Sequence, residues 1–176
     1  MDLFEDAIKQ LKNKAYKISR LMDYVEKNAI NVKFIKTNNS NVSYNYRYNT
    51  VDKDRIEYNV LAVEVDKVGH ELAHLWYKHE YPSINLKNNL NSELISTLAE
   101  LVYSMDTYNG KYYLMSQFDT DDIKKIIKVF WDNPSYDNLD SFVNKFMEKR
   151  GKDYKDFVFD RDSFLGQVEN FKNLFK

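Results

Sequence analysis

The spacing of hydrophobic positions predicts a helix, then short strands, then more helices. Residues 2–28 carry apolar side chains at alternating steps of four and three, which predicts one long helix. A short strand is predicted over residues 31–36. From Val42 to Tyr48, and again from Ile56 to Ala62, apolar or aromatic and polar residues alternate with a period of two, with a turn expected at residues 52–54. We therefore predict a β-hairpin directly before the next helix.

The remaining pattern is helical. An apolar stripe at helical spacing indicates a half-buried helix that ends near Glu80, ahead of Pro82; its members are Val65, Val68, Leu72, Leu75 and Trp76. Further helices are expected over residues 90–105, from 119–122 through Phe130, over 137–149 with an end at Gly151, and over 160–175. The predicted fold class is α+β: a small antiparallel or mixed sheet packed on a central helix, with additional N- and C-terminal helices.

Composition narrows the class of protein. The 176 residues, of which 43% are hydrophobic and 30% charged, suit a single domain over residues 1–176. The formal net charge of -1 provides no global field that would recruit nucleic acid or a membrane surface. The chain has no cysteine, no apolar run long enough to span a bilayer, and an acidic start, MDLFEDAIKQ. We therefore expect a cytoplasmic protein without disulfides, thiolate metal ligands, or nucleic-acid or membrane partners.

The predicted central helix contains the candidate chemistry. Its residues 70–74 are HELAH, so His70 and His74 stand four apart on one helical face, where both neutral imidazoles can bind one metal ion. Glu71, about 100° round the helix from His70, can reach a water bound to that metal and act as general base. The alternative is an accidental spacing on a solvated helix face. Two of the chain's three histidines fall in the motif, which favours a metal site.

A third metal ligand is expected on the following helix. Glu93 comes after eighteen residues that follow His74, and Glu100 lies seven residues further on, close to two helical turns. One carboxylate can therefore face the metal, while the other is a candidate for orienting a ligating histidine from outside. The alternative is that both carboxylates are solvent-facing charges. His79 is not expected to be a ligand, because it lies about 140° round the helix from His74.

These motifs resemble those of known enzymes. The stretches HELAHLW and LNSELISTLAELVY are similar to the gluzincin zinc metallopeptidases, and most closely to the aminopeptidase N family. The resemblance implies a zincin-like fold and a zinc ion (Zn2+) held by His70, His74 and Glu93. It also implies peptide-bond hydrolysis with Glu71 as the catalytic base. The small intracellular metallopeptidases of the ImmA/IrrE type, which act on repressor proteins, are similar in size and share the HExxH motif.

Two departures favour an endopeptidase over an aminopeptidase. The Gly-x-Met-Glu-Asn stretch with which those aminopeptidases hold a free amino terminus does not precede His70. Ser92 stands where they place an asparagine, with Asn91 displaced by one position. We therefore expect an endopeptidase acting on a peptide or protein substrate, such as a regulatory protein. The alternatives are an aminopeptidase and a catalytically silent zincin-fold binding module, and the intact Glu71 argues against the latter.

No residue is assigned to stabilise the oxyanion of the reaction. Gluzincins supply a tyrosine or a histidine from later in the chain, and no histidine follows His79 here. Five downstream tyrosines match no family motif and are expected to be structural: Tyr108, Tyr112, Tyr113, Tyr136 and Tyr154. The sequence predicts no oligomeric state.

Overall fold

The computed structural model of the chain describes residues 8–9, 12, 17, 19–36, 43–46, 54–58, 65–107 and 121–176. Within this part of the chain the elements follow in the order α2 (Ser19–Lys27), β1 (Val32–Lys36), β2 (Ser43–Tyr46), β3 (Asp54–Tyr58), α3 (Val65–Glu80), α4 (Leu90–Thr107), α5 (Asp121–Asp132), α6 (Tyr136–Tyr154) and α7 (Arg161–Asn173). The protein is mostly helical with a small sheet, in line with the predicted α+β class.

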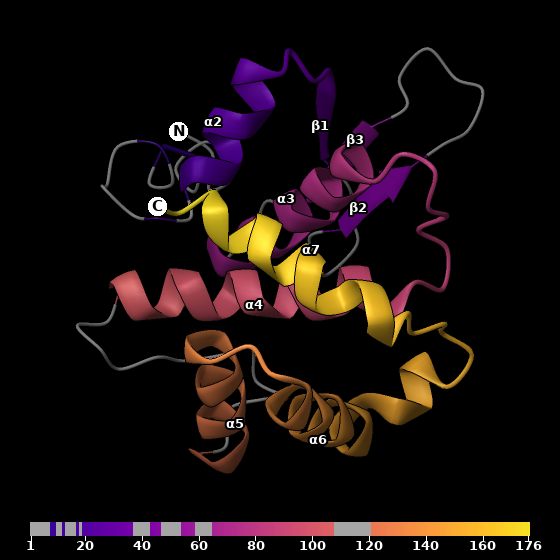
Figure 1. The fold of residues 1–176 in the computed structure, drawn as a ribbon. Coiled ribbons are helices and arrows are strands. Elements are labelled where there is room, and N and C mark those ends of the chain that lie inside the picture. Colours follow the sequence, from indigo (N-terminus) through magenta and orange to yellow (C-terminus); the bar gives the residue numbers. More distant parts are fainter. Residues whose placement is uncertain are drawn as a thin grey trace.

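The sheet lies beside the helix that carries the HExxH motif. Figure 1 shows α4 crossing the middle of the molecule, with α5 and α6 on one side and α3 and α7 on the other. The strand order is β1-β3-β2; β1 is parallel to β3, and β2 is antiparallel to β3. The sheet is therefore mixed, and β2 and β3 form the predicted hairpin pair.

Asp54 lies inside a strand, so the prediction that it belongs to a turn was wrong. It begins β3, and its side chain is buried. Lys78 and His79, in the last turn of α3, both bind its carboxylate, His79 through Nε2 at 2.8 Å. A buried carboxylate requires such partners, and here they fasten the central strand to α3. The rest of the predicted turn and the strand ends at 47–48 and 59–62 lie outside the described residues.

The predicted helix over residues 2–28 is not continuous. Lys17 lies in a turn, and its carbonyl oxygen accepts a hydrogen bond from Arg20 N at 2.9 Å. The helix α2 begins only at Ser19. The apolar spacing continues through this turn, so periodicity did not reveal the break. α2 buries Leu21, Met22 and Val25 in the core.

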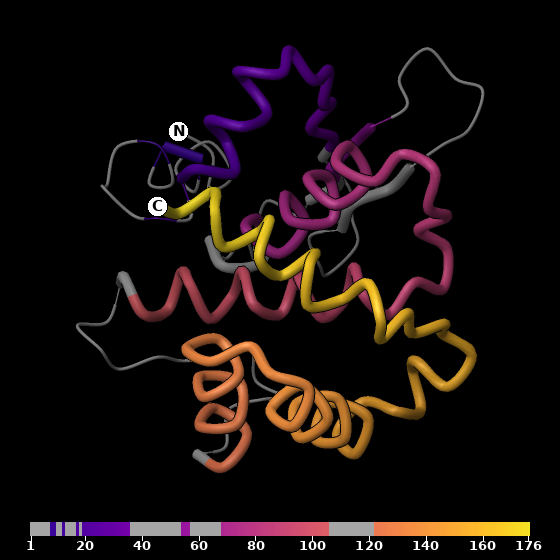
Figure 2. Tube along the Cα trace, viewed as in Figure 1, coloured from indigo at the N-terminus to yellow at the C-terminus, as the bar shows by residue number. Residues whose placement is uncertain are grey.

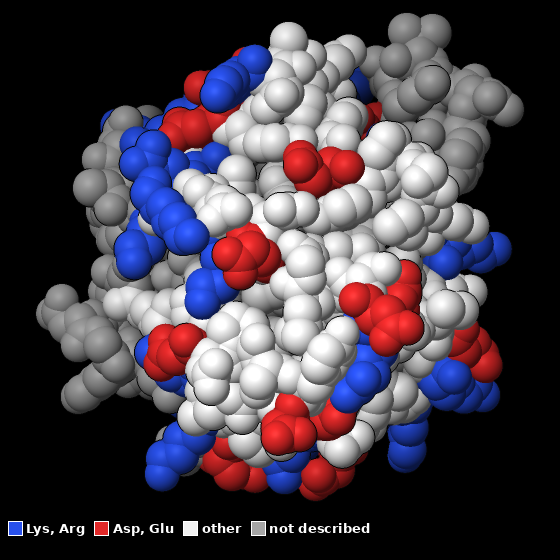
Figure 3. Space-filling model, viewed as in Figure 1, with Lys and Arg blue, Asp and Glu red and all other residues white. Residues whose placement is uncertain are grey.

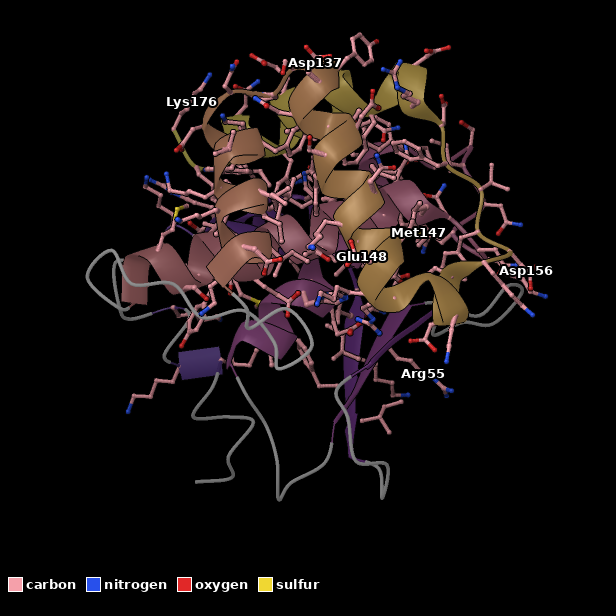
Figure 4. All side chains as sticks on the ribbon, turned by 90° about the horizontal axis from the view of Figure 1, so that it is seen from below. Arg55, Asp137, Met147, Glu148, Asp156 and Lys176 are labelled. Atoms are coloured by element: carbon pink, nitrogen blue, oxygen red, sulfur yellow. The ribbon has the colours of Figure 1, made fainter. Side chains whose placement is uncertain are left out.

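α6 continues past its predicted end at Gly151 and finishes at Tyr154. A Cβ atom at Gly151 would meet only Met147 Cε, at 3.8 Å, and a glycine inside a helix costs only about 1 kcal/mol relative to alanine. Gly151 is therefore a tolerated helical residue. Figure 4 shows α6 extending from Asp137 at one end, with the chain running on to Asp156 beyond the other.

A buried polar network fastens the start of α4 to the C-terminal helix. Asn91 Nδ2 donates to Asp160 O and to Gln167 Oε1, and Asn91 Oδ1 accepts from Asp160 N, each at 2.9 Å. Gln167 Oε1 also accepts from the Tyr77 hydroxyl at 3.1 Å. These bonds join α3, α4 and α7. Figure 2 traces the chain from the end of α6 back across α4 into α7.

Asn91→Leu should lower the free energy of unfolding by about 3 kcal/mol. The leucine has a similar size, but it removes three hydrogen bonds, two to the backbone of Asp160 and one to Gln167 Oε1, which keeps the Tyr77 hydroxyl as a donor. A hydrogen bond of this kind contributes about 1 kcal/mol. Urea denaturation followed by circular dichroism measures the change. The exposed Asn144→Ala on α6 is the control and should shift the same quantity by less than about 0.5 kcal/mol. Equal stabilities of Asn91→Leu and the parent would contradict the structural role of the network.

The surface carries both signs of charge. On the face shown in Figure 3, Lys and Arg side chains are interspersed with Asp and Glu, in keeping with the net charge of -1. In the part of the chain that the structure describes, no helix is both long and apolar enough to cross a membrane. Many large aromatic side chains are buried, among them Trp76, Phe130, Phe142, Phe164 and Phe171.

Candidate metal centre

Two histidines stand together on α3. The helix faces the core with the buried side chains of Val68, Leu72, Leu75 and Trp76, while the side chain of Val65 lies outside the described part. His70 and His74 are four positions apart in the sequence, and their ring centroids are 5.0 Å apart with the planes at 73°. His70 is buried and His74 is half-buried. Both imidazoles therefore lie on one side of the helix, next to its core stripe.

α4 brings one carboxylate to the two imidazoles. Asn89 caps this helix, because its Oδ1 accepts a hydrogen bond from Ser92 N at 2.9 Å. Glu93 thus lies in the first turn, where the helix dipole favours a negative charge. Its Oε2 lies 3.7 Å from His70 Nε2, and its Oε1 lies 3.5 Å from His74 Nε2. Both rings present the same nitrogen to one carboxylate.

These three side chains form a group that could hold a metal ion. One ligand atom from each of His70, His74 and Glu93 lies within 4.8 Å of the others. A tetrahedral ion with bonds of about 2.1 Å holds its donors about 3.4 Å apart. The separations of 3.7 Å from His70 Nε2 to Glu93 Oε2 and 3.5 Å from His74 Nε2 to Glu93 Oε1 are close to that value, each to a different oxygen of the carboxylate. Among the described residues, no other group of three acidic, histidine or cysteine side chains meets the same condition.

Each histidine has an outer partner on α4 that fixes its ring. His70 Nδ1 lies 3.3 Å from Glu100 Oε2, and His74 Nδ1 lies 2.7 Å from Ser92 Oγ. Because Nδ1 of each ring is engaged, Nε2 is the nitrogen that faces Glu93. Glu100, the candidate for orienting a ligating histidine, thus contacts His70 and is not a member of the three-residue group.

Ser92 was not anticipated at the site. Its hydroxyl bonds to His74, whereas Asn91, the residue before it, belongs to the network that holds the C-terminal helix. Ser92, at the position where the aminopeptidases have an asparagine, is therefore the residue that contacts His74, while Asn91 contacts the C-terminal helix. The signal that could have found it is the position of Ser92 directly before Glu93, in the first turn of a helix capped by Asn89.

Negative charge is concentrated around the two imidazoles. Burial disfavours the charged form of His70, but hydrogen bonds to Glu100 and Glu93 raise its pKa well above the usual value. Burial also opposes ionisation of Glu93, yet the charges of His74 and His70 hold the pKa of that carboxyl far below its usual range. The charge of Glu71 acts on His70 as well. A site with more carboxylates than imidazoles favours a bound cation.

Glu71 and His79 lie outside the three-residue group. Glu71 is half-buried on α3, directly after His70, and its charge reaches that ring without the residue joining the group. His79 bonds to Asp54, away from the other two histidines. It is therefore a partner of a buried carboxylate and is not a ligand of the group.

Tyr154 is a second residue at this site that was not anticipated from the sequence. Its hydroxyl donates to Glu93 Oε2 at 3.4 Å. Burial and the negative charge of Glu93 raise the pKa of Tyr154, so the phenol keeps its proton and remains a donor. An expected helix end at Gly151 concealed this contact. The other downstream tyrosines are Tyr136, at the far end of α6, and Tyr108, Tyr112 and Tyr113, which lie outside the described residues.

Comparison with known proteins gives no match: no family model, no curated protein and no solved structure corresponds to this chain. The geometry itself provides two histidines and one glutamate that could hold a metal ion, and each of the three has a hydrogen-bonding partner behind it.

Proposed function

We propose that this protein is a zinc-dependent peptidase with a zincin-like fold, which acts inside the cell as an endopeptidase on a regulatory protein. The observation that carries the proposal is the convergence of His70, His74 and Glu93 from two helices. Two histidines and one glutamate are a ligand set of catalytic zinc sites, which leave one coordination position open. Structural zinc sites use four protein ligands, and among the described residues no fourth ligand joins this group.

Glu71 is the proposed general base. A zinc ion held at this site would lower the pKa of a coordinated water and polarise the scissile carbonyl. Glu71 accepts the proton of the attacking water and delivers it to the leaving amine. Two observations support this role: Glu71 directly follows His70, and its negative charge raises the pKa of that imidazole. Glu100 and Ser92 hold the two rings in the orientation that exposes Nε2.

The sheet offers a place for an extended substrate. β2 lies at an edge of the sheet and packs against α3, which carries both histidines. The backbone groups on a strand edge can pair with an extended peptide in the manner of an added strand. The edge strand β2, followed later in the chain by α3 with the two histidines and α4 with Glu93, supports the zincin-like arrangement. The outer edge of β2 supports a peptide substrate.

Zinc content and peptide cleavage, measured on the same preparation, test the proposal. Purified protein should contain close to one zinc ion per chain by elemental mass spectrometry, as expected for a site with one group of three ligands. It should also cleave internal bonds in a library of N-acetylated peptides. A zinc chelator should abolish the cleavage, and added zinc should restore it.

Other results would contradict this function in distinguishable ways. Protein without zinc, even after incubation with the metal, would remove the metallopeptidase. Cleavage only of peptides with a free amino terminus, one residue at a time, would indicate an aminopeptidase. Stoichiometric zinc without cleavage of any peptide would favour the binding module.

A further inference from the structure

The candidate metal centre extends to the end of α6. Two of its three candidate ligands have hydrogen-bonding partners on α4, Glu100 behind His70 and Ser92 behind His74. The third candidate ligand, Glu93, is approached from a different element. The hydroxyl of Tyr154 donates to its Oε2 at 3.4 Å, across sixty-one positions of sequence.

The ring of Tyr154 is held from several sides. Phe146 lies 5.3 Å away and Phe157 lies 4.7 Å away between ring centroids, the second in an edge-on arrangement. The Arg150 guanidinium stands over the ring, 5.0 Å from its centroid. A ring packed in this way has little rotational freedom. Its hydroxyl is therefore directed at Glu93 by the fold and does not depend on Glu93 for its position.

The segment after Tyr154 is attached to the residues that precede Glu93. Val158 N donates to Asn88 O at 2.8 Å, and Leu90 N donates to Val158 O at 2.9 Å. These bonds form a parallel bridge between the chain after α6 and the chain before α4. The hydroxyl and the carboxylate thus belong to two segments that are already joined, so ordering them for the contact costs little conformational entropy.

We propose that Tyr154 is a positioning residue of the metal centre, whose hydroxyl holds the Glu93 carboxylate facing the two imidazoles. The inference rests on the proposed function, because it requires a metal ion at His70, His74 and Glu93. A carboxylate at the start of a helix can rotate about its side-chain bonds, and a donor fixed on one of its oxygens limits that rotation. Outer partners of this kind change metal affinity by about 10-fold to 100-fold.

The zinc affinity of Tyr154→Phe tests this role without any assay of activity. Phenylalanine keeps the packed ring and removes only the hydroxyl. We expect the dissociation constant for zinc, measured by competition with a chromophoric chelator, to rise about 10-fold. Tyr81→Phe is the matched control, because its hydroxyl bonds to Asn170 and it is not part of the site. The control should bind zinc like the parent, and thermal unfolding before zinc is added should show that both variants fold.

A second background tests whether the hydroxyl acts through Glu93. In Glu93→Ala protein, measured with a weaker competitor, adding Tyr154→Phe should cause no further loss of zinc affinity. An equal loss in both backgrounds would overturn the inference, since the hydroxyl would then act elsewhere. Equal zinc affinities of the parent and Tyr154→Phe would also overturn the inference. A parent that binds no zinc would overturn the proposed function itself, which is a different result from either of these.

Discussion

Glu71→Gln should abolish measurable peptide hydrolysis while leaving zinc bound. Glutamine has nearly the same size, so the half-buried position on α3 is preserved, but its amide cannot take up a proton. A positioned general base contributes about 100-fold to 10000-fold to the rate. We therefore expect kcat to fall by at least about 100-fold at an unchanged zinc content. Initial rates on a cleavable peptide and elemental analysis of the same sample measure the two quantities.

The control for this prediction is Glu169→Gln, which makes the same chemical change at an exposed position on α7. Its turnover should equal that of the parent. Full activity in zinc-loaded Glu71→Gln protein would show that another group takes the proton. Loss of zinc from the same variant would instead make Glu71 a ligand, in conflict with its place outside the three-residue group.

The part of the site that lies on one helix could be predicted from the sequence. The geometry of an α-helix is fixed, so two histidines four residues apart share a face whatever the rest of the chain does. The same reasoning placed Glu93 and Glu100 nearly in register on the next helix. Glu100 indeed approaches His70, while Glu93 approaches both histidines. What periodicity did not provide is the packing of α4 against α3, which the resemblance to gluzincins supplied as an expectation.

Tyr154 shows why the rest of the site was hidden. Its contact with Glu93 depends on the length of α6 and on the way the chain returns to the start of α4, and neither leaves a periodic signal. A single glycine was also taken as a helix end. Glycine favours termini, but its cost inside a helix is about 1 kcal/mol, which the burial of Phe142 and Phe146 on the same helix can exceed.

Buried polar residues were the other source of error. Asp54 was assigned to a turn, and Asn91 was considered only as a displaced family residue. Both are buried and hydrogen-bonded to distant elements. Patterns of apolar and polar residues treat a polar side chain as exposed, which is correct for most Asp and Asn residues. The exceptions are found only when the partner is known, because burial of such a group is tolerated when its hydrogen bonds are satisfied.

Glu93→Ala should remove most of the zinc. Among the described residues, Glu93 is the one carboxylate found to face both Nε2 atoms, and its deletion leaves two histidines as protein ligands. Loss of an outer partner alone weakens metal binding by about 10-fold to 100-fold, so loss of a direct ligand should exceed about 100-fold. Purified Glu93→Ala protein should contain little zinc after mild chelation, under conditions in which the parent retains it. Competition with a chelator of known affinity gives the ratio of dissociation constants.

Glu100→Gln separates a ligand from an outer partner in the same measurement. Its amide can still bond to His70 Nδ1, but it lacks the negative charge, so we expect a loss of about 10-fold in zinc affinity. The ligand assignment therefore predicts an order of zinc affinities. Glu93→Ala should bind zinc much more weakly than Glu100→Gln, and the exposed Glu169→Ala should bind it as tightly as the parent. The reverse order of the first two would make Glu100 the ligand and Glu93 its outer partner. Unchanged zinc in Glu93→Ala would remove Glu93 from the metal centre, and with it the open-site geometry on which hydrolysis depends.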